Sequence, residues 1–182
     1  MKIRSSALGF TLMELILVIV LLSILSLFAA SRFMGSSSFS AYALQERVIS
    51  VIRQVQVNRM QSNISIPNKS YPERCLPSSY KAGEDSSYTN FCLSITSTCI
   101  GSSAACGLAS KERDTRSDIV VDKSAKFSLT NAVTNPIEFD LLGNPINSAS
   151  GGVSILIEDK HGRSRCQVEI NSQGYVSKGT CS

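Results

Sequence analysis

The strongest pattern in the chain is a run of apolar residues close to its N-terminus. Residues 10–30 read FTLMELILVIVLLSILSLFAA, and 17 of these 21 side chains are apolar. As an α-helix with a rise of ~1.5 Å per residue, the run would extend ~31 Å, which matches the ~30 Å hydrocarbon layer of a bilayer. We therefore predict a transmembrane helix over residues 10–30.

A short basic segment precedes this run. Residues 1–9 (MKIRSSALG) contain Lys2 and Arg4 and no acid, and cations beside a membrane helix favour the cytoplasmic side. We therefore expect the rest of the chain on the opposite face of the membrane. A secretory signal peptide, cleaved at the small residues near 29–31, is the alternative.

One acid, Glu14, interrupts the apolar run. An unpaired carboxylate inside a membrane helix is costly, so such a residue usually has a function. If the chain is cut between Gly9 and Phe10, the new α-ammonium of a neighbouring copy could pair with Glu14, and neither charge would remain alone in lipid. The alternative is a carboxylate near the headgroups that reaches water.

A second helix is predicted over residues 31–62, where apolar positions are spaced three and four apart. Its predicted buried face consists of Phe39, Tyr42, Ala43, Val48, Ile49, Val51, Ile52, Val55 and Met60. The polar positions are expected in solvent and include Arg47, Arg53, Gln54, Gln56 and Arg59. Gly35 and the serines around it weaken the helix, which predicts a kink or a melted turn.

Residues 63–182 are expected to form a globular head with two parts that differ in composition and predicted secondary structure. Residues 63–118 are rich in proline and serine and predict a loop-rich insertion. Residues 119–182 predict one antiparallel sheet, whose apolar face the amphipathic helix would cover. Its candidate strands are 119–122, 126–130, 137–141, 153–159, 166–170 and 175–178. The predicted fold class is therefore α+β.

Composition agrees with one globular domain attached to one apolar segment. The 182-residue chain is 43% hydrophobic and only 18% charged, whereas soluble proteins contain about 25% charged residues. Most of the apolar excess lies in residues 10–30. The remaining residues suffice for one hydrophobic core and hardly for two.

The six cysteines are expected to form disulfides, because a head exported to an oxidising compartment favours them. A turn that pairs residue 170 with 175 would set Cys166 opposite residue 179, one diagonal step from Cys181. Cys166–Cys181 is therefore the preferred bridge, and it would stabilise the hairpin by roughly 3 kcal/mol. Proximity alone favours Cys75–Cys92 and Cys99–Cys106. No cysteine spacing is CxxC, so no metal site is predicted.

Catalysis and cofactor binding are not predicted. His161 is the only histidine and lies in the turn-like segment KHGRSR, which is typical of a solvated loop. Asp159 beside it forms no triad without a positioned nucleophile. We therefore do not expect an enzyme.

Four cations surround the last predicted hairpin, namely Lys160, Arg163, Arg165 and Lys178. Such a patch on an exposed head could hold DNA phosphates. Acids interleave with these cations, and no series of aromatic residues accompanies them. Solvated surface charge is therefore the preferred interpretation.

Residues Gly9 to Leu15 read GFTLMEL and closely resemble the type IV prepilin signature. The shared features are a glycine before the cut, an aromatic first mature residue, an acid at the fifth mature position and an unbroken apolar helix behind a basic leader. The resemblance implies that residues 1–9 are a class III leader, removed after Gly9 by a membrane aspartic peptidase. It further implies N-methylation of Phe10 and a role for Glu14 in setting the register of assembly.

The resemblance also implies a type IV pilin-like fold, in which residues 10–30 and 31–62 form one long helix packed on the sheet. Many pilins have a C-terminal loop bounded by a disulfide, which again favours Cys166–Cys181. Pilins of this family often carry a proline where this chain has Ser31. This difference leaves the position of the kink open.

Further segments look like the minor pilins of mannose-sensitive haemagglutinin (MSHA) type IV pili, and like H-type pseudopilins and T-type fimbrial minor pilins. These segments are residues 31–56, IEFDLLGNP and VEINSQGYV. The resemblance implies a structural minor pilin that waits in the inner membrane with its head in the periplasm and then joins a pilus, where it primes assembly or contacts surfaces. Its partners would be the prepilin peptidase, other major and minor pilins, the inner-membrane assembly platform and membrane lipid. The alternatives are a type II secretion pseudopilin and a DNA-binding minor pilin.

Overall fold

The computed structural model describes residues 11–33, 39–113, 115–160, 162 and 164–182. The chain divides into two units, Met1–Ser36 and Ser37–Ser182. The first unit contains helix α1 (Leu12–Phe33), and the large apolar side chains from Leu12 to Leu25 are exposed. Among the helices that the described residues form, none combines the length and the apolarity needed to cross a membrane. The predicted kink near Gly35 lies outside the described residues.

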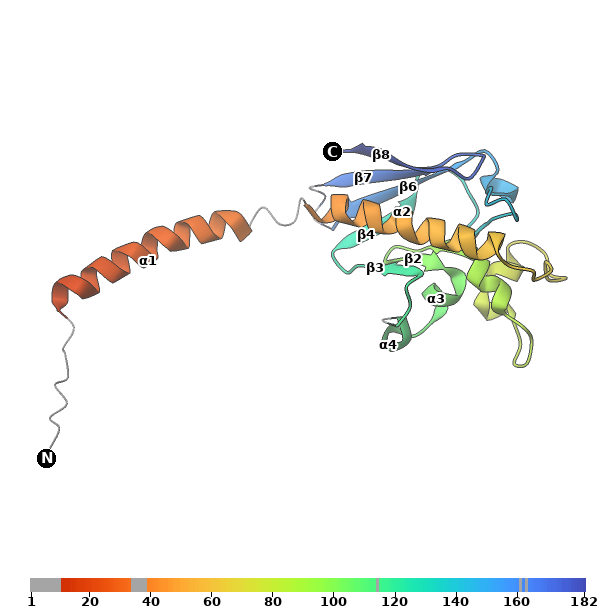
Figure 1. The fold of residues 1–182 in the computed structure, drawn as a ribbon, viewed down its shortest axis with the longest axis horizontal. Coiled ribbons are helices and arrows are strands. Elements are labelled where there is room, and N and C mark those ends of the chain that lie inside the picture. Colours follow the sequence, from red (N-terminus) through yellow and green to blue (C-terminus); the bar gives the residue numbers. More distant parts are fainter. Residues whose placement is uncertain (1–10, 34–38, 114, 161, 163) are drawn as a thin grey trace, which may run out of the picture. The chain divides into compact units, whose positions relative to one another are not determined.

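The second unit, the head, combines one long helix with antiparallel sheets and three disulfides, so the α+β class is confirmed (Figure 1). Its helices are α2 (Phe39–Met60), α3 (Ser103–Gly107), α4 (Ser110–Arg113) and the 3₁₀ turns η1 (Glu73–Cys75), η2 (Pro77–Ser79), η3 (Ser87–Phe91) and η4 (Asn147–Ala149). Its strands are β1 (Cys92–Ile95), β2 (Cys99–Ser102), β3 (Ile119–Val121), β4 (Ala125–Leu129), β5 (Ile137–Glu138), β6 (Val153–Asp159), β7 (Arg165–Ile170) and β8 (Val176–Cys181).

These strands form two sheets, which corrects the prediction of one sheet over residues 119–182. The first sheet has the order β3-β2-β1-β5, and the second has the order β4-β6-β7-β8. Strands β1 and β2 belong to residues 63–118, so this segment is more than a loop-rich insertion. Two of the strands predicted after residue 118, β3 and β5, pair with β2 and β1 and not with the other strands predicted after residue 118.

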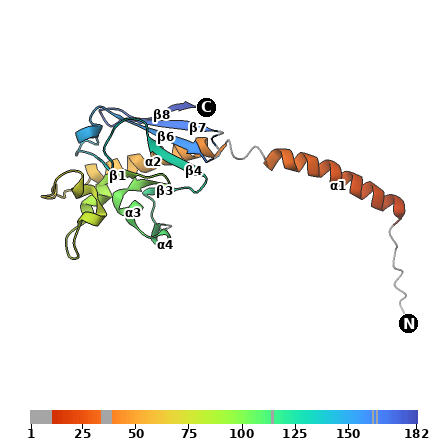
Figure 2. The same cartoon turned by 180° about the vertical axis from the view of Figure 1, so that it is seen from behind.

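Helix α2 packs against both sheets and contacts β2 and β3 of the first and β6, β7 and β8 of the second. Figures 1 and 2 show the helix from its two sides, with both sheets lying along it. The helix buries Ala41, Leu44, Val48, Ile52 and Val55. These positions follow the spacing of three and four that predicted the helix.

The predicted buried face of α2 is wrong at three positions. Tyr42 is 47% exposed, Met60 is 50% exposed, and Ala43 is also exposed. Conversely, Gln56 and Arg59 were expected in solvent and are only 6% and 3% exposed. They are buried because loops of the head close over them and supply hydrogen-bond acceptors, which helical periodicity does not reveal.

In the second sheet, buried and more exposed side chains alternate along β6 and β7. Along β6 and β7, Val153, Ile155, Ile157, Val168 and Ile170 are buried in the core that α2 covers. The intervening side chains lie on the opposite face of the sheet. That outer face carries the groove described below.

Candidate functional site

Glu14 lies in the first turn of α1 and is exposed. Its backbone N–H donates a hydrogen bond of 3.3 Å to Oγ1 of Thr11, which immediately precedes the helix. This arrangement caps the N-terminus of α1, where the helix dipole also favours a negative side chain. The predicted cleavage and methylation positions, Gly9 and Phe10, lie outside the described residues.

All six cysteines are paired in the way that the sequence favoured. The bridges are Cys75–Cys92, Cys99–Cys106 and Cys166–Cys181, with Cα–Cα distances of 5.7, 6.1 and 4.1 Å. They join η1 to β1, β2 to α3, and β7 to β8. Each bridge therefore fixes an irregular segment or a strand end to a neighbouring strand.

The register behind the last bridge differs from the prediction. Residue 170 pairs with Val176 instead of residue 175, and a β-bulge between Cys166 and Val168 shifts the pairing by one more position. Cys166 therefore lies directly opposite Cys181 and not opposite residue 179. A bulge of this kind inserts one extra residue into a strand.

The structure does not bring the predicted basic patch together. Arg165 is on the outer face of β7 and forms an ion pair with Glu158, N to O 2.9 Å. Lys178 pairs across the sheet with Val168, whose side chain is buried on the α2 side, and it forms an ion pair with Glu46 of α2. Lys160 is exposed, and Arg163 and His161 lie outside the described residues.

A buried ion pair joins the loop-rich segment to β5, and the sequence did not predict it. Arg74 donates two hydrogen bonds of 2.7 Å to the carboxylate of Glu138, whose side chain is only 1% exposed. The hydroxyl of Tyr88 and the amide of Asn147 donate to the same carboxylate at 2.8 and 2.6 Å. Burial opposes the ionisation of Glu138, but these hydrogen bonds and the charge of Arg74 outweigh it and hold its pKa below the ordinary value.

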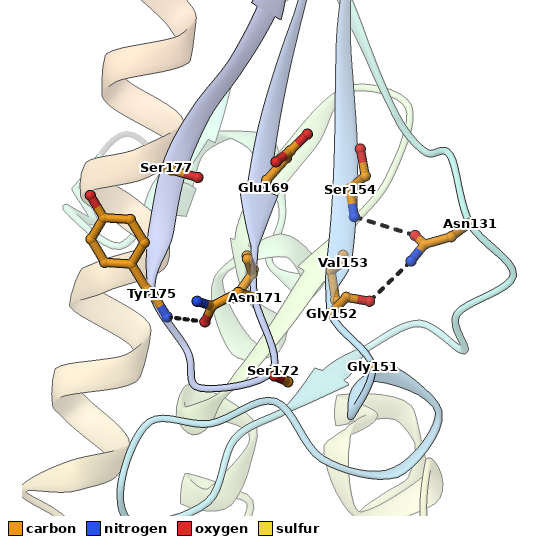
Figure 3. Close-up of a pocket in the computed structure, with 11 residues that line it drawn as sticks. Asn131, Gly151, Gly152, Val153, Ser154, Glu169, Asn171, Ser172, Tyr175 and Ser177 are labelled. Atoms are coloured by element: carbon orange, nitrogen blue, oxygen red, sulfur yellow. Dashed lines mark hydrogen bonds between the residues drawn. The ribbon is translucent and has the colours of Figure 1, made fainter.

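A polar groove of about 380 Å³ lies at one end of the outer face of the second sheet (Figure 3). Cross-strand pairing places Ser154, Glu169 and Ser177 in one row on three adjacent strands. Residues directly opposite each other in a sheet point to the same face, so this row forms the floor of the groove. The turn after β7 and the segment before β6 form its end, and they contribute Gly151, Gly152, Asn171, Ser172 and Tyr175.

Two asparagines hold the backbone around this groove. The amide of Asn131 donates to the carbonyl of Gly152 at 3.0 Å, and its oxygen accepts from the backbone N–H of Ser154 at 3.3 Å. The side-chain oxygen of Asn171 accepts from the N–H of Tyr175 at 2.9 Å, and the N–H of Asn171 donates to the carbonyl of Tyr175 at 3.0 Å. The backbone that carries the Tyr175 ring is therefore fixed at both its donor and its acceptor.

Gln56 of α2 forms hydrogen bonds that hold the 171–174 turn. Its side-chain amide donates to the carbonyls of Gly174 and Gly143, at 2.8 and 2.9 Å. Gly174 has a φ of +77°, and a Cβ there would collide with the carbonyl oxygen of Gly143. Only glycine fits this close approach of two turns.

Several groups in the groove take no part in holding the fold. Tyr175 is 65% exposed. Among the described residues, the carboxylate of Glu169 forms no hydrogen bond or ion pair, and the amide nitrogen of Asn171 has no acceptor. In the sequence, Glu169 is one of the acids that interleave with the cations of the basic patch, and no role in a groove was predicted for it. Two sequence signals could have identified Glu169. The alternation of apolar and polar residues along β7 places its side chain on the outer face, and a turn followed by a tyrosine begins two residues later.

No group of three or more histidine, cysteine or acidic side chains that could hold a metal ion occurs in the part of the chain that the structure describes. Comparisons with models of protein families, with curated proteins and with solved structures found no match to this chain.

Proposed function

We propose that this chain is a pilin-like structural subunit and not an enzyme. In this proposal the chain is inserted in the inner membrane through residues 10–30, with its head in the periplasm. A prepilin peptidase cleaves it after Gly9 and methylates Phe10. The assembly platform then moves the mature chain into a filament with other pilins, as a minor subunit of an MSHA-like pilus.

The observation that carries the proposal is the apolar surface of α1, a helix that begins within the motif GFTLMEL. From Leu12 to Leu22, every side chain of α1 except Glu14 is apolar, and all of them are exposed. One helix cannot bury apolar side chains that point in every direction, so it needs lipid or other helices around it. A filament core built from such helices would supply this burial without the membrane.

Two further features support the proposal. Glu14 lies in the first helical turn of α1, near the end of the helix at which the ammonium of a neighbouring cleaved copy would pair with its carboxylate. The three disulfides suit a head that is exported to an oxidising compartment. A short type II secretion pseudopilus would use the same features, and it is the second candidate.

The test separates the charge of Glu14 from its place in the helix cap. Glu14→Ala removes the carboxylate, and Thr11→Ala removes the hydroxyl that caps α1 but leaves the charge. We expect both variants to be cleaved and to remain in the membrane. Only Glu14→Ala should lower incorporation into sheared filaments, by about tenfold or more, because an unpaired ammonium would then remain in the filament core. Equal incorporation of Glu14→Ala and the unsubstituted chain would contradict the proposal.

A further inference from the structure

We infer that the groove at the end of the outer face of the second sheet binds a neutral sugar ring of a glycan. Its walls combine an exposed aromatic ring, an unpaired carboxylate, amides and hydroxyls within one depression (Figure 3). The inference concerns the head alone and does not rest on the proposed function.

The size of the groove suits one or two sugar rings. Its volume of about 380 Å³ lies near the lower end of the ~300–1,000 Å³ found for small-molecule sites. It is lined by residues of β6, β7 and β8, the turn between β7 and β8, the segment before β6 and the loop after β4, and hydrogen bonds of Asn131 and Asn171 hold this backbone in place. The groove is therefore a preformed feature of the fold.

Tyr175 supplies the apolar wall. One face of a pyranose ring carries mainly C–H groups, and it packs well on the flat face of an aromatic side chain. The backbone of Tyr175 is held at both its N–H and its carbonyl by Asn171. Little conformational freedom would be lost when a ligand packs on the ring, because a tyrosine side chain has only two rotatable bonds.

The polar groups match the hydroxyls of a sugar. The carboxylate of Glu169 is a strong acceptor, and a hydroxyl hydrogen bond to it is charge-assisted. The amide nitrogen of Asn171 is a donor, and the hydroxyls of Ser154, Ser172 and Ser177 can donate or accept. A ligand with several adjacent hydroxyls requires both donors and acceptors, because each hydroxyl can donate and accept a hydrogen bond.

The charge of the groove selects among possible ligands. Glu169 is the only charged residue that lines it, so phosphate groups, nucleic acids, uronic acids and sialic acids would be repelled. A peptide ligand is disfavoured, because Tyr175 is the only large exposed apolar side chain in the lining. A neutral sugar uses the aromatic ring, the carboxylate, the amides and the hydroxyls of the lining together.

The test uses the full chain in a zwitterionic detergent, because a detergent with a sugar headgroup would compete for the groove. Saturation-transfer NMR and titration would be performed with four free sugars, namely glucose, galactose, mannose and N-acetylglucosamine, and with glucuronic acid as the acidic comparison. We expect at least one neutral sugar to bind with a millimolar dissociation constant. Glucuronic acid should bind more weakly than glucose.

Four variants locate the binding. Tyr175→Ala should weaken it about tenfold by removing the packing surface, whereas Tyr175→Phe keeps the ring and should retain most of the affinity. Glu169→Gln should weaken neutral sugars about threefold or more and should reduce the discrimination against glucuronic acid. Tyr42→Ala removes another exposed tyrosine, on α2 and outside the groove, and should change nothing.

Near-ultraviolet circular dichroism and intact disulfides would confirm that each variant is folded. Failure of all four neutral sugars to bind at 10 mM, as an order of magnitude for weak single-site recognition, would overturn the proposal. So would binding that either Tyr175→Ala or Glu169→Gln leaves unchanged, or a preference for the acidic sugar.

Discussion

The ion pair between Arg74 and Glu138 gives the sharpest prediction about stability. Glu138 is 0% exposed as a residue, and both carboxylate oxygens are occupied by Arg74, Tyr88 and Asn147. Arg74→Ala would leave a buried carboxylate without its cation. The expected loss is about 3–5 kcal/mol, because an uncompensated charge remains in the core.

The matched control is Arg165→Ala. Arg165 also forms an ion pair, with Glu158, but its side chain is 57% exposed and the pair lies on the outer face of the sheet. Exposed pairs contribute about 0–1 kcal/mol. In thermal unfolding of the full chain, followed by near-ultraviolet circular dichroism, Arg74→Ala should lower Tm by about 10 °C and Arg165→Ala by no more than ~3 °C.

The loss of Tm caused by Arg74→Ala should depend on pH, because it depends on the ionisation of Glu138. Its pKa is lower in the folded chain than in the unfolded chain, so the stabilisation is present above the ordinary value of 4.5 and is lost as the pH falls through the folded pKa. The gap in Tm between the unsubstituted chain and Arg74→Ala should therefore be large at pH 7 and shrink as the pH falls below 4.5 and through the folded pKa of Glu138. Equal Tm values for Arg74→Ala and Arg165→Ala at pH 7, or a gap that widens in acid, would refute this reasoning.

Two further predictions concern the C-terminal half of the head. Gln56→Leu removes two hydrogen bonds and leaves the carbonyls of Gly143 and Gly174 without this donor, so it should cost about 2 kcal/mol. Faster amide exchange in the 171–174 turn would check it, with Gln54→Leu as the comparison on α2, because Gln54 donates to Ser117 and not to this turn. Replacing Cys166 and Cys181 together by serine should lower the unfolding free energy by roughly 3 kcal/mol. Unchanged unfolding of this double variant would contradict the role of the bridge.

Local patterns were sufficient to predict much of the head. The spacing of apolar residues predicted α2, and alternation predicted β6 and β7 within one residue at each end. All three disulfides were predicted, because each joins cysteines that are neighbours along the chain or across a hairpin. These features depend on interactions that are close in sequence.

The features that were missed depend on distant partners. Strands β1 and β2 have the sequences CLSI and CIGS, which are too short and too rich in small residues to differ from loop. Their pairing with β3 and β5 creates the first sheet. The burial of Arg59 likewise depends on the carbonyl of Phe139 and on the ring of Tyr88, which are far away in sequence.

The groove could be predicted only in part. Alternation places Glu169 and Ser154 on the solvent face, and the segment NSQGY predicts a turn. The contribution of Asn131 depends on a loop that follows β4 and returns to the start of β6. The packing of the 171–174 turn against Gly143 is also a tertiary contact and has no local signal.

The most direct test of the central claim is the intact mass of the chain recovered from membranes and sheared filaments of cells that produce it. The account predicts a chain that begins at N-methylated Phe10, keeps α1 and all three disulfides, and occurs in both fractions. A chain that begins near residue 31 and is found free in the periplasm would contradict it.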